Sequence, residues 1–206
     1  MANADTPFGL RPIRHRNGAP YNGAVNPYYV PAGYGTALFV GDPVVKTGTA
    51  NSTHVEAPGA GAFAPGTLPA INKAAAGDNN PITGVIVGFA PDPNGLESRY
   101  NAASTERVAL VCDDPDVVFE IQADGAIAAT QVGLNAVLIY TNSGDTVNGI
   151  SGAELDTSSD APAADASNQL TIQRVVNRED NEAGSAFTKV EVKINNHTEA
   201  HGALGI

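Results

Sequence analysis

Apolar and polar side chains alternate with a period of two along several short stretches of the chain. Residues 185–195 carry apolar or β-branched side chains at every second position from Thr188 to Ile194, with charged residues between them. This period is typical of a strand with one buried face and one face in water. Residues 116–123 show the same alternation, so we expect a second strand there.

Other stretches are apolar without alternation. Residues 81–89 are continuously apolar and rich in β-branched side chains, which predicts a buried strand with glycines at bulges or close approaches. Turn residues separate the remaining candidates, which lie at 37–46 (interrupted at Gly41-Asp42-Pro43), 107–112, 134–140 and 170–176. Few segments show helical periodicity. The fold class predicted is all-β, an antiparallel β-barrel or sandwich body with little helix.

The pattern divides the chain into an arm, a body and a tail. Residues 1–35 are interrupted by Pro and Gly and predict an extended N-terminal arm. Residues 36–197 form the β-rich body, with long loops inserted at 47–80 and 141–168, which are rich in small and turn-forming residues. Residues 198–206 are expected to form a flexible tail.

Composition supports short strands over long helices. The chain has 206 residues, of which 42% are hydrophobic, so it can form a substantial core. Aromatic residues are only 6% and tryptophan is absent, whereas Gly (22) and Pro (14) are abundant. Such a composition favours turns and short strands.

Charge excludes two classes of partner. Eleven basic and 22 acidic side chains give a net charge of −11, which repels nucleic acid and anionic membranes. The sequence starts without a charged and then apolar leader, and it has no apolar run of about 18 residues. We therefore expect a protein made in the cytoplasm without a signal peptide, with no nucleic-acid or membrane partner.

The N-terminal region has a different character from the rest. Four of the six tyrosines lie in the first 41 residues, together with Asp5 and three arginines, a net charge of +2. Arg and Tyr are enriched at protein–protein interfaces. We predict that the arm docks on a neighbouring subunit or partner. The alternative is a loop-rich strand region packed on its own domain. The candidate partner-binding residues are Phe8, Arg11, Arg14, Arg16, Tyr21, Tyr28, Tyr29 and Tyr34.

No pattern of residues predicts an enzyme. Cys112 ends an apolar run, where a buried strand cysteine is commoner than a nucleophile. Ser151 sits in Gly149-Ile150-Ser151-Gly152-Ala153, which departs from the G-x-S-x-G elbow at its last position. We therefore predict a non-enzymatic protein with no catalytic residue.

Two clusters could in principle bind a metal ion. His197 and His201 have a spacing of four residues, which suits a metal on a helix, but a frayed tail is the favoured explanation so close to the end of the sequence. Asp113, Asp114 and Asp116 could hold Ca²⁺, or form a solvated turn between two strands. The simpler interpretation is taken for both, and no metal or cofactor is predicted.

Several short stretches, taken in order, resemble a group of small virion structural proteins of tailed phages. Such proteins are usually encoded beside the major capsid protein and regarded as head decoration or cement proteins. The resemblance spans nearly the whole chain, and its motifs are turns and strand ends. They are residues 7–12 (PFGLRP), 41–44 (GDPV), 83–89 (TGVIVGF), 113–120 (DDPDVVFE), 132–135 (VGLN), 151–152 with 155–156, 180–182 (DNE) and 194–197 (INNH).

The resemblance implies a β-barrel-like body, a flexible N-terminal arm and oligomers, often trimers, seated on the outer surface of the capsid. The partners expected are the major capsid protein and further copies of this chain, and the expected location is the virion. The expected function is to bridge capsomers against internal pressure. Two alternatives stay open: another virion component of the neck, tail or fibre, and a β-sandwich module that binds glycans.

Overall fold

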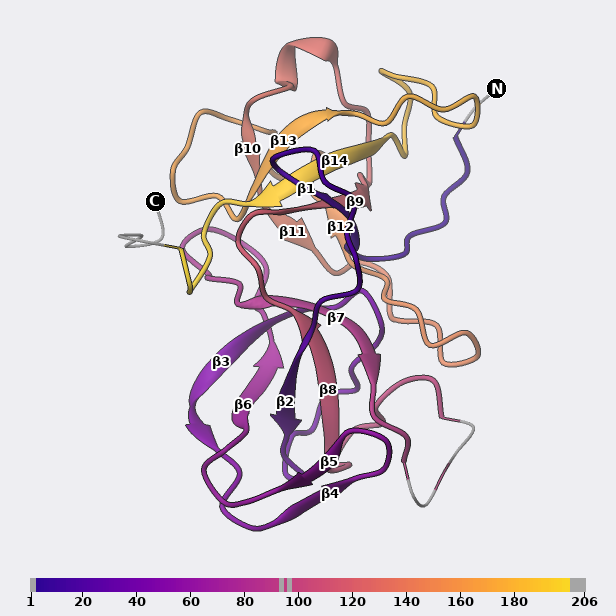
Figure 1. Ribbon diagram of the computed structural model, residues 1–206. Coiled ribbons are helices and arrows are strands. Elements are labelled where there is room, and N and C mark those ends of the chain that lie inside the picture. Colours follow the sequence, from indigo (N-terminus) through magenta and orange to yellow (C-terminus); the bar gives the residue numbers. More distant parts are fainter. Residues whose placement is uncertain (1–2, 93–94, 96–97, 201–206) are drawn as a thin grey trace.

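The regular structure of the chain consists of short strands. The computed structural model describes residues 3–92, 95 and 98–200, which contain fourteen strands and one turn of 3-10 helix (Figure 1). The predicted all-β class is therefore confirmed. No helix in these residues is long and apolar enough to cross a membrane.

A small closed barrel forms one half of the molecule. Its strand order is β2-β6-β3-β7-β8, and all neighbours are antiparallel except β2 and β6. Side chains of about eight buried residues fill its interior, among them Tyr28, Val44 and Ile86. The strands are β2 (Asn26–Val30), β3 (Pro43–Ala50), β6 (Pro69–Lys73), β7 (Gly84–Phe89) and β8 (Arg107–Cys112).

An antiparallel five-stranded sheet forms the other half, in the order β1-β9-β14-β13-β10. Central β9 and β14 are fixed in register by pairs such as Phe119 with Val192. The strands are β1 (Arg11–His15), β9 (Val117–Gln122), β10 (Asn135–Ala136), β13 (Leu170–Val175) and β14 (Lys189–Ile194).

Three small elements complete the fold. The hairpin of β4 (Val55–Ala57) and β5 (Gly61–Phe63) lies at the end of the barrel farthest from the five-stranded sheet (Figure 1). Strands β11 (Leu138–Ile139) and β12 (Glu154–Leu155) pair with each other. The 3-10 turn η1 spans Ala129–Gln131.

One core joins the two halves. The largest buried cluster surrounds Phe119 of the sheet and also contains Val85 of β7 and Cys112 of β8. At Gly84 the two barrel strands approach so closely that a Cβ atom would lie 2.4 Å from the Cys112 carbonyl oxygen. Only glycine fits such a contact. Barrel and sheet are therefore packed against each other.

The predicted extended N-terminal arm, residues 1–35, is wrong for its described part, residues 3–35. Strand β1 is an edge strand of the sheet, and β2 closes the barrel against β8. The physical reason is burial: Leu10, Tyr28 and Val30 are 1%, 4% and 0% exposed. Tyr28 and Val30 stand two residues apart, so both side chains point to the same face of β2, the barrel interior. The alternative of strands packed on their own domain is what the chain adopts.

Residues 47–80 were predicted to be a long inserted loop, and this prediction is also wrong. The segment contains the end of β3 and all of β4, β5 and β6. Residues 141–168 contain only β12 as regular structure. In the predicted tail, Thr198 donates its backbone N–H to the Ile82 carbonyl at 3.0 Å, and Glu199 forms an ion pair with Lys46. Residues 198–200 are thus attached to the barrel, and residues 201–206 lie outside the described residues.

Candidate partner-binding site

The structure distributes the eight predicted binding residues over three places. Three tyrosines belong to the barrel, two arginines are held by carboxylates, and Phe8, Arg11 and Tyr21 line a surface groove. Only the last three are brought together.

The barrel tyrosines make internal hydrogen bonds. Tyr28 donates its hydroxyl to Asp113 at 2.7 Å, and burial together with this bond raises its pKa. Tyr29 donates to Glu106 at 2.7 Å, and burial followed by this contact raises its pKa to about 12. The Tyr34 hydroxyl accepts the backbone N–H of Lys73 at 3.0 Å. These groups tie strands together.

Two of the three arginines form ion pairs within the chain. The Arg14 Nη2 lies 2.6 Å from the Glu191 carboxylate, and Arg16 Nη1 lies 3.5 Å from Asp116. Arg14 links β1 to β14 across the sheet. The predicted role of these two side chains in partner binding would require them to leave these contacts.

The groove lies where residues 8–12 of the N-terminal segment cross the barrel beside Gly41 and Ile86. It has a volume of about 310 Å³ and a predominantly apolar lining. The Arg11 guanidinium stacks over the Phe8 ring, 4.6 Å from its centroid, which supports both side chains at the rim. The Tyr21 hydroxyl donates to the Ala24 carbonyl at 2.8 Å. The lining residues are Phe8, Leu10, Arg11, Pro12, Tyr21, Val40, Gly41, Ile86, Val87 and Ile150.

Backbone contacts between distant segments form the groove. Leu10 donates its N–H to the Gly41 carbonyl at 2.9 Å, and Val40 exchanges bonds with the 149–151 segment. The Ser151 hydroxyl donates to the buried Asp42 carboxylate at 2.6 Å, and Lys73 lies 2.9 Å from the same carboxylate. The hydrogen bond from Ser151 to this carboxylate attaches the 141–152 loop to the barrel.

The same loop carries two exposed apolar side chains, of which Ile150 lines the groove. Val147 is 78% exposed and Ile150 is 37% exposed. The Asp145 carboxylate accepts the Val147 and Asn148 backbone N–H groups at 2.7 and 3.2 Å, which lowers its pKa. This Asx turn fixes the tip of the loop. Ile150 and Val40, which line the groove, were not among the binding residues predicted from the sequence, and no local pattern marks them as such.

The two side chains considered as possible nucleophiles, Cys112 and Ser151, are buried. Cys112 is 1% exposed, and burial raises its pKa to about 11, which disfavours the thiolate. Ser151 is 1% exposed, and its hydroxyl donates to the Asp42 carboxylate, which also lies 2.9 Å from Lys73. Neither group opens on the groove.

The groups weighed for metal binding have protein partners. Asp113 accepts from Asn26 and Tyr28, while the Asp114 carboxylate lies 3.3 Å from His15. Among the described residues there is no group of three His, Cys, Asp or Glu side chains placed to hold a metal ion. His201, the predicted companion of His197, lies outside them.

Comparisons with protein-family models, with curated proteins and with solved structures gave no match. The function is therefore inferred from the geometry of the groove and its surroundings.

Proposed function

We propose that this protein is a capsid decoration or cement protein, which binds the outer surface of a tailed-phage head and bridges capsomers. The observation that carries the proposal is the apolar groove lined by the exposed Ile150, on a chain with a net charge of −11. An exposed apolar patch rimmed by polar groups on an acidic protein is typical of a docking surface.

The groove suits a partner segment that projects an apolar side chain. Ile150 would lose water on docking, and Arg11, supported by Phe8, is oriented at the rim to meet a capsid carboxylate. Each of these contacts contributes little binding free energy by itself. In a lattice of many copies, with trimers around threefold positions as the sequence resemblance implies, such contacts add and make dissociation slow.

Exposed residues of the groove allow a test that leaves the core intact. Ile150→Glu places a charge in the groove, so we expect affinity for undecorated heads to fall about tenfold or more. Val132→Glu is the matched control because Val132 is 39% exposed and lies beyond η1, outside the groove. Co-sedimentation with heads measures both variants. Equal binding by the two variants would exclude the groove as the docking surface.

A further inference from the structure

Four asparagines of the chain are followed directly by glycine. They are Asn17, Asn22, Asn94 and Asn148. In such a pair the glycine nitrogen can attack the amide carbon of the asparagine side chain, because glycine has no side chain to hinder the approach. Ammonia leaves, and water opens the resulting succinimide to aspartate or isoaspartate, which makes asparagine a thermolabile residue. The nucleophile is the glycine nitrogen, so its hydrogen bonding controls which pair reacts.

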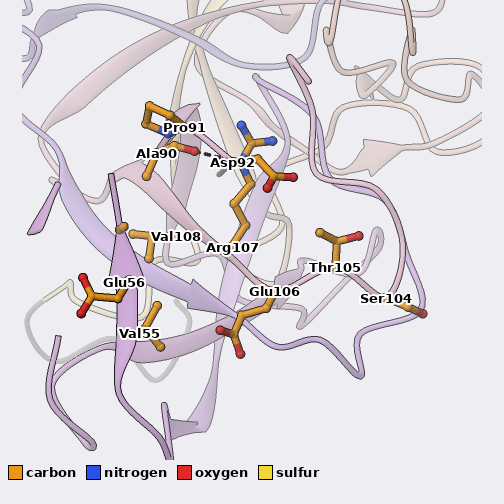
Figure 2. A pocket seen from close by; sticks show the side chains of 11 residues that line it. Val55, Glu56, Ala90, Pro91, Asp92, Ser104, Thr105, Glu106, Arg107 and Val108 are labelled. Atoms are coloured by element: carbon orange, nitrogen blue, oxygen red, sulfur yellow. Dashed lines mark hydrogen bonds between the residues drawn. The ribbon is translucent and has the colours of Figure 1, made fainter. Parts of the chain in front are cut away.

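Two of these glycines donate their N–H groups to a carbonyl three residues earlier in the chain. Gly18 donates to His15 at 3.0 Å, within the turn that follows β1. Gly95 donates at 3.2 Å to Asp92, a residue that lines the pocket beside β4 and β8 (Figure 2). Its neighbour Asn94 lies outside the described residues. A bonded N–H must leave its acceptor before the nitrogen can attack, which slows the reaction.

The Asn148-Gly149 pair is held still more firmly. Gly149 is buried and donates its N–H to the Asp145 carbonyl at 2.8 Å. The Asn148 Nδ2, which would leave as ammonia, donates to the Asp145 carboxylate at 2.6 Å. A Cβ on Gly149 would lie 2.6 Å from the Arg99 carbonyl oxygen, so the glycine backbone has little room to move. Both the nucleophile and the leaving group are therefore restrained.

The Asn22-Gly23 pair lacks this protection. Both residues are exposed and belong to residues 21–25, which form no regular structure between β1 and β2. The Gly23 N–H has no hydrogen-bond partner in the part of the chain that the structure describes. The Asn22 Oδ1 accepts the Ala24 N–H at 3.1 Å. This Asx turn folds the side chain toward the following backbone, and the bond stabilises the negative charge that develops on Oδ1 during the attack.

Asn17 provides a matched comparison within the same molecule. Residues 17–19 and 22–24 are both Asn-Gly-Ala, and both asparagines are exposed. Both Oδ1 atoms accept the alanine N–H, at 3.0 and 3.1 Å, and the two glycines have φ angles of +91° and +84°. The pairs differ in the glycine N–H, which is hydrogen-bonded in the first and free of such a bond among the described residues in the second.

We infer that Asn22 is a site of spontaneous deamidation in the folded protein. The Gly23 nitrogen bonds to the Asn22 Cγ, and its proton passes through solvent to Nδ2, which leaves as ammonia. Water then opens the ring at Cγ to give aspartate, or at the backbone carbonyl carbon to give isoaspartate, whose main chain is one carbon longer. The reaction consumes one water molecule and involves no oxidation or reduction.

The product changes the rim of the apolar groove. Tyr21 lines the groove, and its hydroxyl donates to the Ala24 carbonyl at 2.8 Å. Residue 22 lies between these two bonded groups, so the longer main chain of isoaspartate would displace the carbonyl from the hydroxyl. Either product also adds one negative charge to a chain whose net charge is already −11.

Peptide mapping by mass spectrometry tests the inference on the full-length protein. The folded protein is kept in mildly alkaline buffer at physiological temperature, and chymotrypsin then separates Asn17 from Asn22 by cleavage after Tyr21. We expect Asn22 to lose its amide at least about tenfold faster than Asn17, because the hydrogen-bonded turn at Gly18 must open first. In water enriched in heavy oxygen, the product at position 22 should contain one heavy oxygen atom.

The same chain unfolded in guanidinium chloride is the control. The two Asn-Gly-Ala sequences should react there at similar rates, because the hydrogen bond that distinguishes them is lost. In the folded protein, Gly23→Ala should slow the reaction, since its Cβ would hinder the attack while meeting nothing else within 4 Å. Equal rates at Asn17 and Asn22 in the folded protein, or an unreactive Asn22, would overturn the inference. The measurement uses no phage heads, so its outcome is independent of the proposed function.

Discussion

At the scale of single residues, the groove depends on a contact between two glycines. Gly9 and Gly41 have φ angles of +69° and +95°. A Cβ on Gly9 would lie 2.4 Å from the Gly41 carbonyl oxygen and 2.7 Å from the Ser151 Cβ. The N-terminal segment can cross the barrel here only because neither residue has a side chain.

Gly9→Ala is therefore expected to lower the free energy of unfolding by about 2–4 kcal/mol, through left-handed strain and overpacking. Gly18→Ala is the control, because Gly18 has a φ of +91° and a Cβ atom at this position would meet nothing within 4 Å. It should cost only about 1 kcal/mol. Urea denaturation measures both, and equal losses would show that the close approach is unimportant.

His197 gives the protein a pH-dependent stability. It is 1% exposed, its Nδ1 accepts the Glu199 N–H at 3.0 Å, and its Nε2 has no hydrogen-bond partner among the described residues. Burial lowers its pKa; nearby Glu199, Asp113 and Asp114 oppose this effect, and Lys46 adds to it. Protonation would also turn the Nδ1 acceptor into a donor that faces another donor.

Because its pKa is lower in the folded state, the unfolded state takes up the proton first as the pH falls. The free energy of unfolding should therefore decrease below about pH 6.5, by at most about 1.4 kcal/mol per pH unit. Stability measured from pH 8 to 5 should depend less on pH in His197→Gln than in the wild type. His54→Gln, at an exposed position, should keep the wild-type profile, and identical profiles for all three proteins would contradict this account.

At the scale of elements, charged side chains form a row across one face of the sheet. Glu191 of β14 lies directly opposite Glu120 of β9 in register. Arg14 and Arg174 lie 2.6 and 2.8 Å from the Glu191 carboxylate, and Arg178 lies 2.8 Å from Glu120. The charged face of β14 was expected to be in water, but these arginine side chains cover it at this point. Glu191 is therefore only 7% exposed.

Burial alone would raise the pKa of Glu191, but hydrogen bonds and charge from Arg174 and Arg14 together leave it below its usual value. Its stabilising effect should be present above about pH 4.3 and be lost as the pH falls through the lowered pKa. At pH 7, Glu191→Gln should lower the free energy of unfolding by about 1–3 kcal/mol. Arg174→Gln, at a 58% exposed side chain, should cost less than about 1 kcal/mol. Thermal and urea unfolding test this order.

Strands with a clear hydrophobic pattern could be predicted from the sequence. Residues 107–112 correspond to β8, and the expected strands at 116–123 and 170–176 correspond to β9 and β13 within a residue or two. The stretch 134–140 instead divides into β10 and β11, which belong to different sheets. Hydrophobic periodicity locates a strand but does not show which other strand it pairs with.

The groove was predictable only in part. Phe8, Arg11 and Tyr21 were chosen for residue type, and the same reasoning also chose Tyr28, which the barrel buries. Residue type cannot separate an interface tyrosine from a core tyrosine. Ile150 reaches the groove from far along the chain because its neighbours Gly149 and Ser151 form backbone hydrogen bonds with Val40, and no local pattern predicts such a contact.

At the scale of the whole molecule, barrel and sheet are expected to unfold together. The cluster around Phe119 contains residues of both, including Cys112 of β8. Burial raises the pKa of the Cys112 thiol to about 11, so a thiol reagent should react with it only after unfolding. Cys112 labelling and circular dichroism should give one coincident urea transition. Labelling that precedes the loss of circular dichroism would show that the halves separate.

The apolar groove lies where the N-terminal segment, the barrel and the 141–152 loop meet, and it is the surface by which the proposed function has the molecule dock on the capsid. The most direct test of the central claim is the copy number of this chain relative to the major capsid protein in purified particles. The account predicts about one copy per capsid subunit, as expected for a cement lattice. A few copies per hundred capsid subunits, or none, would contradict it.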